Sequence, residues 1–290
     1  IVHIFHAYKS GIGLDMAKKY NIPLIVTMTG TDYNESLEDP DKKNTIQKVL
    51  HASAKITFFN QQSQQLVEKT FPKCISKMQS VLKDYEVLST SNFSFRETYH
   101  IDKNDLVLVM IGGIRPVKNN IFPLRVFKKL HDLYPQIKLI FIGEEQNSDY
   151  AQKLKRRAHH HPGIIFTGAL SRKQMDSVYR EIDMVLNTSH SEGGPNVLLE
   201  ALYYKKPILL NHKIAHIVLD GQLPEAVYQA DDEIDFENKL KKYIINEGFR
   251  SYLGKKGHEY FLSKINPYEG QDYHNIYLSV LQSEPGQTNY

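Results

Sequence analysis

The sequence predicts an α/β protein with two domains, each built on a parallel sheet. Short apolar, β-branched runs alternate with amphipathic helical runs along almost the whole chain, as in parallel sheets that are covered by helices on both faces. With 290 residues, the chain is also long for a single hydrophobic core. The alternation breaks once, between about residues 84 and 105, in a polar stretch rich in Ser and Thr. Such a stretch is typical of a junction between domains.

The first part of the chain is expected to hold three strands separated by helices. The strands are predicted at Val2–Ala7, Leu24–Thr29 and Lys55–Phe59. The helices are predicted at Gly13–Tyr20, Asn44–Ala52 and Ser63–Phe71. Three strands are few for a doubly wound domain, and the first begins at residue 1 without Met or a lead-in segment. We therefore expect the N-terminal domain to be incomplete.

The second part is expected to be a complete α/β domain. Its strands are predicted at Leu106–Ile111, Lys138–Ile142, Ile164–Thr167, Met184–Thr188 and Pro207–Leu210. Its helices are predicted at Ile121–Leu133, Asp149–Ala158, Arg172–Ile182 and Asn196–Tyr204, and a last helix is predicted at Asp272–Leu281. The expected organisation is a partial domain over residues 1–90, a linker over 91–104, a complete domain over 105–265 and a helix over 266–290 that returns toward the N-terminal domain.

Composition restricts the class of partner and the compartment. The 36 basic and 33 acidic residues nearly cancel, so nucleic acid is not an expected partner. The single cysteine, Cys74, excludes an internal disulfide and fits a reducing compartment, so we expect a cytoplasmic protein. No apolar run approaches the ~20 residues of a membrane helix, and no peripheral membrane contact is evident from the sequence.

Polar motifs follow four of the predicted strands, at the edge where open α/β sheets bind ligands. In GGIRPVK, Gly112 and Gly113 end a strand, and Arg115 and Lys118 follow. Glycines let a ligand approach the backbone, and two cations three residues apart can clamp an anion. The spacing excludes a Walker A loop and a dinucleotide-binding loop. Taken alone, the motif leaves open a tight turn with two solvated cations.

Two carboxylates flank a Gly-Gly-Pro turn in SEGGPNVLLEA, Glu192 in the loop and Glu200 in the predicted helix. Pro195 suits the first helical position, so the helix is expected to start at Gly194 or Pro195, with backbone amides that favour an anion. Eight residues of helix span ~12 Å, which exceeds the roughly 5–9.5 Å between the paired acids of a glycosidase. The spacing favours one extended ligand held at two points. The alternative is one acid at a helix N-terminus and a second, exposed acid.

Two further motifs are less specific. TMTGTDYN places Thr29 and Asp32 at a strand end, where they could face a cleft or form an ordinary turn capped by Asp. NHKIAHIVLDG places His212 and His216 four residues apart, without the adjacent Glu and the third ligand of a zinc site. We therefore expect no metal ion.

Together these motifs resemble the retaining glycosyltransferases of family four, which have the GT-B fold of two Rossmann-like domains with parallel sheets. The resemblance covers nearly the whole chain. Its most specific element is E-x7-E from Glu192 to Glu200, followed by the pair Arg115 and Lys118. The compact RPVK, together with HAYKSG and TGTD, is most similar to the subgroup called glycosyltransferase 1 domain-containing proteins.

The resemblance implies a metal-independent, hexosyltransferase-like enzyme that moves a sugar, with retention of configuration, from a nucleoside-diphosphate sugar to an unknown acceptor. That acceptor could be a small molecule, a lipid or a protein glycan. Arg115 and Lys118 would bind the donor's diphosphate, Glu200 its ribose hydroxyls and Glu192 its sugar. The other implied donor-binding residues are Gly112, Gly113, Gly194, Pro195, Asn196, Val197, Thr29 and Asp32.

Three departures from the family pattern shape the alternatives. Thr29 stands where many members carry a His. NHKIAH replaces a Gly-rich turn, so that His212 or His216 would enter or partly close the donor site. The first strand and its glycine-rich loop are absent, so the chain could instead be an inactive nucleotide-binding protein or a partner-binding module. A two-lobed solute-binding protein is a third alternative, and E-x7-E with the two cations weighs against it.

Overall fold

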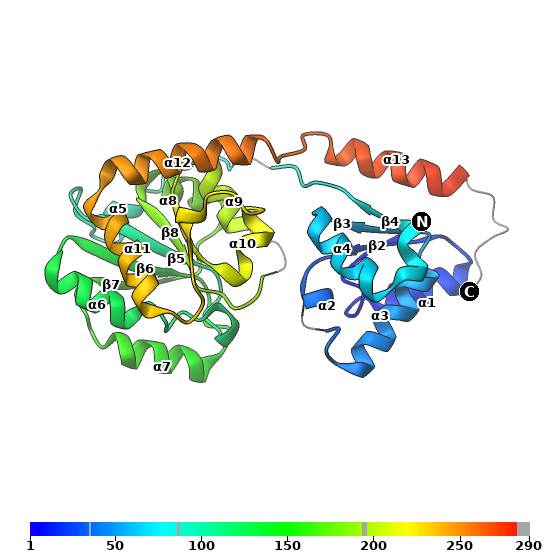
Figure 1. Cartoon of the computed structure of the whole chain (residues 1–290), viewed down its shortest axis with the longest axis horizontal. Coiled ribbons are helices and arrows are strands. Elements are labelled where there is room, and N and C mark those ends of the chain that lie inside the picture. Colours follow the sequence, from blue (N-terminus) through cyan, green and yellow to red (C-terminus); the bar gives the residue numbers. More distant parts are fainter. Residues whose placement is uncertain (35, 86–87, 193–195, 283–290) are drawn as a thin grey trace. The chain divides into compact units, whose positions relative to one another are not determined.

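The chain forms two compact units, one mainly from residues 1–85 and 264–290 and the other mainly from residues 86–191 and 195–263. The computed structural model describes residues 1–34, 36–85, 88–192 and 196–282, without the side chains of Thr31 and Asn34. Figure 1 labels most of the helices and strands of both units. Each unit is built on its own parallel sheet, so the α/β prediction is confirmed.

The first unit has a four-stranded sheet in the order β1-β2-β3-β4. The strands are β1 (Val2–Phe5), β2 (Leu24–Met28), β3 (Lys55–Phe58) and β4 (Met78–Ser80). The helices are α1 (Gly11–Tyr20), α2 (Thr31–Asn34), α3 (Pro40–Ala52), α4 (Gln61–Thr70), the 3-10 helix η1 (Pro72–Lys77) and α13 (Glu269–Gln282). All its strand pairs are parallel and consecutive in sequence.

Both faces of this sheet are covered. One face packs against α1, α3 and α4 in a continuous apolar cluster. On the other face, Ile25 of β2 packs with Tyr273 and further apolar residues of α13. The His3 ring is hydrogen-bonded to the Thr27 and Tyr277 hydroxyls, each at 2.8 Å. Apolar packing and hydrogen bonds therefore both fix α13 on the first unit.

The second unit has a six-stranded parallel sheet in the order β10-β9-β8-β5-β6-β7. The strands are β5 (Leu106–Ile111), β6 (Ile137–Ile142), β7 (Ile164–Gly168), β8 (Met184–Asn187), β9 (Ile208–Asn211) and β10 (Val227–Tyr228). The α-helices are α5 (Phe95–Thr98), α6 (Leu124–Leu133), α7 (Ser148–Ala158), α8 (Met175–Glu181), α9 (Asn196–Tyr203), α10 (His212–Val218), α11 (Glu233–Ile245) and α12 (Glu247–Leu262). Short 3-10 helices are η2 (Pro116–Lys118), η3 (Arg172–Gln174) and η4 (Pro224–Ala226).

This strand order creates a switch point beside β5. The chain runs outward from β5 through β6 to β7, then returns to place β8 on the opposite side of β5. Connections that leave two adjacent parallel strands in opposite directions open a crevice at the strands' carboxyl ends, where α/β proteins bind ligands. A ligand site is therefore expected where β5 and β8 end.

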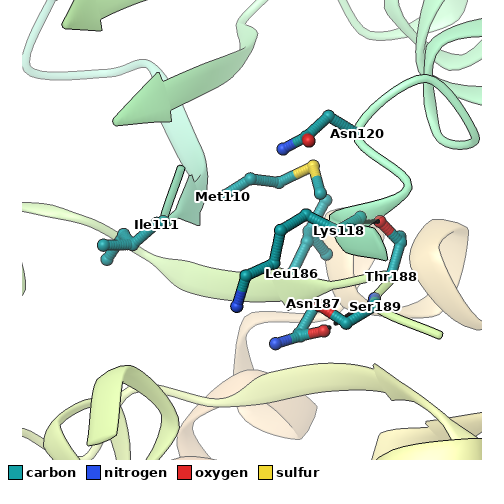
Figure 2. Close-up of a pocket in the computed structure, with 9 residues that line it drawn as sticks. Met110, Ile111, Lys118, Asn120, Leu186, Asn187, Thr188 and Ser189 are labelled. Atoms are coloured by element: carbon teal, nitrogen blue, oxygen red, sulfur yellow. Dashed lines mark hydrogen bonds between the residues drawn. The ribbon is translucent and has the colours of Figure 1, made fainter. Parts of the chain in front are cut away.

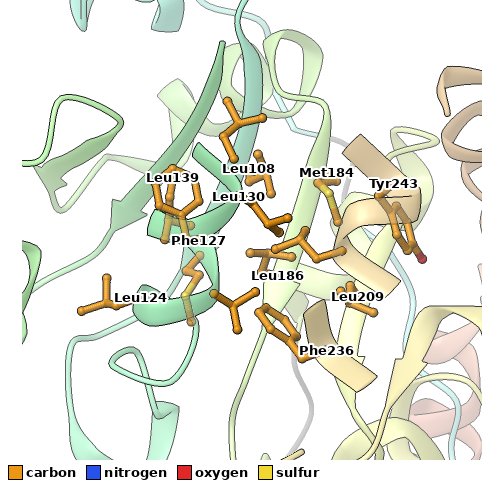
Figure 3. Close-up of a cluster of buried hydrophobic side chains, with 14 of the residues drawn as sticks. Leu108, Leu124, Phe127, Leu130, Leu139, Met184, Leu186, Leu209, Phe236 and Tyr243 are labelled. Carbon is orange, nitrogen blue, oxygen red and sulfur yellow. The ribbon is translucent and has the colours of Figure 1, made fainter. Parts of the chain in front are cut away.

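The core of the second unit holds these strand ends rigidly in place. Leu108 of β5 packs with Phe127 of α6 and Phe236 of α11 in one large cluster (Figure 3). Val107 and Val109, which alternate with it and point to the opposite face, are also fully buried. Burying each such side chain contributes about 1.5–3 kcal/mol, so the strand that leads to the switch point is anchored on both faces.

The predicted linker, residues 91–104, packs against the second unit instead of running free. Its helix α5 contacts α8 and buries Phe95 completely. The Arg96 guanidinium donates to the Glu181 carbonyl and pairs with Asp183 at 3.1 Å. The packing of this polar stretch could not be predicted from its own sequence, because its partners lie at the end of α8, more than 80 residues later. Among the described residues, no helix is long and apolar enough to cross a bilayer.

We expect the second unit to lose stability in mild acid because of a histidine pair. The rings of His131 and His161 lie 4.6 Å apart. Burial lowers the pKa of both, and Lys138 adds to the effect on each. Because the lowered pKa values make the folded state bind protons at these rings less readily than the unfolded chain does, stability falls as pH drops from about 6.5 through the lowered pKa values. Urea denaturation between pH 7.5 and 5 measures this loss, and a His131→Phe variant should lose less. An equal loss in both proteins would contradict the prediction.

Candidate functional site

A small pocket lies at the switch point of the second unit. It is lined by the end of β5, by the loop that follows it and by the end of β8 (Figure 2). Its residues are Met110, Ile111, Gly112, Lys118, Asn120, Leu186, Asn187, Thr188 and Ser189. Asn120 is 4% exposed, and within the described residues its Oδ1 has no hydrogen-bond partner. A buried acceptor of this kind suits a hydroxyl or water at the pocket floor.

The loop that carries Lys118 is fixed to the end of β8. The Thr188 hydroxyl contacts the carbonyls of Lys118 and Asn119, each at 3.0 Å, and the His190 amide donates to the Val117 carbonyl at 2.9 Å. These bonds place Lys118 in the pocket wall. Arg115, at the start of η2, is exposed. The structure therefore places Lys118 in the pocket wall, whereas Arg115 is exposed and is not one of the lining residues.

Glycines allow the neighbouring strand ends to approach closely. Gly112 and Gly143, after β5 and β6, have φ values of +138° and +150°, which side-chain-bearing residues rarely adopt. A Cβ at Gly143 would lie 2.1 Å from the Gly112 carbonyl oxygen, and one at Gly112 would lie 3.8 Å from the Lys118 Nζ. Gly113 has the Gln146 side chain against it. Of the two glycines after β5, Gly112 therefore lies beside the Lys118 side chain and Gly113 beside that of Gln146.

Glu200, the second acid of the E-x7-E motif, is a nearly buried carboxylate on α9. It is 5% exposed. Its Oε2 accepts a hydrogen bond from the Tyr179 hydroxyl of α8 at 2.8 Å, and its Oε1 accepts one from the Arg172 guanidinium of η3. The sequence motif marks Glu200 only as the second of two acids, whereas in the structure its carboxylate contacts a phenol and a guanidinium.

A second cluster of the same composition lies beside the first. Asp176 of α8 accepts hydrogen bonds from Arg180 and from the hydroxyl of Tyr204, which follows α9. Burial alone would raise the pKa of Asp176, but these two partners hold it below its usual value. Burial and the bond to Asp176 raise the pKa of Tyr204. The Tyr179 and Tyr204 rings stack with centroids 5.3 Å apart. Tyr179 of α8 thus donates to the carboxylate of Glu200 on α9, and Tyr204, just after α9, donates to the carboxylate of Asp176 on α8.

The rest of the SEGGPNV motif is only partly described. Gly194 and Pro195 lie outside the described residues. Glu192 is partly exposed in the loop, and α9 begins with Asn196, which is exposed, and Val197, which is partly exposed. The predicted helix start at Gly194 or Pro195 therefore lies outside the described residues, and the anion-favouring role of the first helical amides stays a prediction.

In the first unit, Asp32 bonds to the backbone around it. It is fully buried. One carboxylate oxygen accepts from the amides of Thr29 and Gly30, at 3.0 and 2.9 Å, and the other from the Ala7 amide at 3.0 Å. The carboxylate therefore ties the end of β1 to the end of β2, as in the alternative of a capped turn. Thr29 takes part in this hydrogen bonding through its backbone amide.

The two histidines after β9 lie on the short helix α10. The His212 Nδ1 accepts a hydrogen bond from the Ala230 amide at 3.0 Å, and burial lowers the pKa of His216. In the part of the chain that the structure describes, no group of three or more His, Cys, Asp and Glu side chains could hold a metal ion. His212 thus has a local partner next to β10.

Comparisons with known proteins agree with this architecture. The sequence model of the family described as "Glycosyl transferases group 1" matches residues 91–260. Glycosyltransferase 1 domain-containing protein 1 of Xenopus tropicalis is 22% identical over 267 residues, which cover 85% of this chain and 75% of that protein. The structure of Anabaena HepE in complex with UDP and glucose superposes with a TM-score of 0.81 at 14% identity, covering 96% of this chain and 78% of that one. The sucrose-phosphate synthase of Thermosynechococcus elongatus superposes with a TM-score of 0.76, also at 14% identity, covering 96% and 73%.

Proposed function

Because the chain belongs to the family of group 1 glycosyl transferases and has the GT-B fold, we propose that this glycosyltransferase transfers a sugar from a nucleoside-diphosphate sugar to an acceptor, with retention of configuration. The observation that carries the proposal is the position of Lys118 in a pocket at the β5/β8 switch point. A similar fold has been solved with UDP and glucose bound. We therefore take a nucleoside diphosphate as the ligand of this pocket.

Charge determines the chemistry that we assign to the pocket. When the bond between the sugar and the diphosphate breaks, negative charge grows on the leaving diphosphate. Lys118 in the wall and the exposed Arg115 would stabilise that charge, aided by the first amides of α9. Preorganised cations of this kind are worth most in a partly desolvated site. The proposal places Glu192 at the donor sugar and needs no metal ion, so EDTA should leave donor binding unchanged.

The ribose is assigned to Glu200. A carboxylate can accept about four hydrogen bonds, so two protein donors still leave it able to accept from the two hydroxyls of a ribose. Hydrogen bonds to a charged group contribute about 1.5–3 kcal/mol each. A nucleoside diphosphate should therefore bind more tightly than inorganic pyrophosphate, which lacks the ribose.

Glu200→Gln is expected to weaken UDP binding about 10-fold or more while leaving the affinity for inorganic pyrophosphate unchanged, because only UDP presents a ribose to this side chain. Isothermal titration calorimetry with both ligands measures the difference. Asp176→Asn, which changes the equally buried carboxylate of the neighbouring cluster, serves as the matched control. If Glu200→Gln weakened the binding of UDP and of pyrophosphate equally, the assignment of the ribose to Glu200 would be wrong.

Transfer itself is tested by incubating the chain with UDP-, GDP- and ADP-sugars and measuring release of the nucleoside diphosphate in the presence of candidate acceptors. We expect one nucleotide to bind preferentially and its sugar to be transferred with retained anomeric configuration. Binding of a nucleoside diphosphate without transfer to any acceptor would instead support the inactive nucleotide-binding alternative. Inverted configuration in the product would contradict the assignment of retention.

A further inference from the structure

The carboxylate of Glu200 is held from two sides by residues that no sequence motif marks. Tyr179 is fully buried, and its hydroxyl lies 2.8 Å from Oε2 and 3.1 Å from the Val197 carbonyl. Arg172 reaches Oε1 from η3, in the loop after β7. One partner therefore comes from the protein interior and the other from a separate loop.

The exposures of the two ionic partners differ sharply. The Arg172 side chain is 54% exposed, whereas that of Glu200 is only 6% exposed. The guanidinium therefore contacts a nearly buried carboxylate from the solvent side. A buried carboxylate without a positive partner is costly, and one held by a single hydrogen bond can rotate. Two donors on different oxygens fix both the charge and the orientation of the group.

We propose that Arg172 and Tyr179 are the positioning residues that hold the Glu200 carboxylate in place for the ribose hydroxyls of the donor nucleotide. The inference rests on the role of Glu200 in the proposed function. Ser171 is the N-cap of η3, and Ser171 and Gln174 form a reciprocal capping box, which fixes the backbone that carries Arg172. The ribose would thus meet a preorganised acceptor, so that little ordering free energy is lost on binding.

The neighbouring cluster, which also joins α8 to the region of α9, supplies a matched control. Arg180 is 60% exposed and pairs with Asp176, which is 5% exposed, and Tyr204 donates to Asp176 as Tyr179 donates to Glu200. Each cluster thus joins a nearly buried carboxylate to a tyrosine hydroxyl and an exposed guanidinium, and the two tyrosine rings stack on each other. Only the first contains the carboxylate assigned to the ribose, so a purely structural role predicts the same effect from equivalent substitutions in either cluster.

The test measures the affinities of the 290-residue chain for UDP and for inorganic pyrophosphate by calorimetry, with melting temperatures recorded alongside. Arg172→Ala and Tyr179→Phe should each weaken UDP binding about 10-fold and leave pyrophosphate binding within about 2-fold of wild type. Arg172→Lys, which keeps the charge, should restore part of the loss. Arg180→Ala and Tyr204→Phe should leave both affinities unchanged.

Four results would overturn the inference. Unchanged UDP binding in Arg172→Ala and Tyr179→Phe, with UDP binding lost in Glu200→Gln, would refute it and leave the proposed function standing. Equal losses in the control cluster would show that the effect is structural. Tighter UDP binding in Arg172→Ala would show that the guanidinium blocks the carboxylate. If the wild type binds UDP no more tightly than pyrophosphate, the ribose role of Glu200 fails as well, and with it that part of the proposed function.

Discussion

Replacing Lys118 with alanine is expected to weaken the binding of UDP and of inorganic pyrophosphate by the same factor, about 10- to 100-fold. The side chain lines the pocket at the ends of β5 and β8, and a charge-assisted hydrogen bond to a phosphate contributes about 1.5–3 kcal/mol. The loss should be common to both ligands because each carries the diphosphate. The Glu200 substitution, by contrast, should affect UDP alone.

Two controls separate this effect from a general change in charge. Lys153→Ala removes an exposed cation of α7 and should change neither affinity. Arg115→Ala should weaken binding less than Lys118→Ala, because Arg115 is exposed and exposed charges are screened by solvent and salt. If Lys118→Ala bound both ligands as tightly as the wild type, the assignment of the diphosphate to this pocket would be wrong.

Much of the fold follows from sequence periodicity alone. All eight predicted strands are present, because each is marked by a run of mostly apolar residues. The sequence pattern missed β4 and β10, which have three and two residues and are too short to show a period. The helix predicted from Ile121 begins instead at Leu124, after Pro123, and the helix predicted from Arg172 divides into η3 and α8.

In the candidate site too, the residues set by local sequence features could be predicted, and those set by long-range packing could not. Gly112, Lys118 and Glu200 are recognisable because turn chemistry and helix spacing are local in sequence. Arg172 and Tyr179 meet Glu200 only because η3 and α8 pack beside α9, 28 and 21 residues away along the chain. Thr188 contacts the loop of Lys118 across about 70 residues, and its place as the last residue of a predicted strand is a sequence feature that could have pointed to it.

Gly143→Ala is expected to destabilise the second unit by about 2–5 kcal/mol and to weaken UDP binding. Its φ of +150° is strained for any residue with a side chain, at about 1–3 kcal/mol. A Cβ there would also lie 2.1 Å from the Gly112 carbonyl oxygen and 2.5 Å from its carbon, where overpacking costs about as much again. Both obstacles are backbone atoms of β5's end, so relief requires moving the strand end that carries the pocket. Urea denaturation measures the first effect and calorimetry the second.

Gly270→Ala provides the matched control, because that glycine lies in α13 with open space around its Cβ position. Alanine favours helix there by up to about 1 kcal/mol, so this variant should be as stable as the wild type or more so. A Gly143→Ala protein with wild-type stability and wild-type UDP affinity would mean that the ends of β5 and β6 can separate freely. The close approach of Gly143 to Gly112 would then have no part in shaping the pocket. A Gly143→Ala protein that lost stability but kept full UDP affinity would show that this close approach matters for folding alone. Loss of stability and of UDP affinity together would show that the geometry of the strand ends also matters for donor binding.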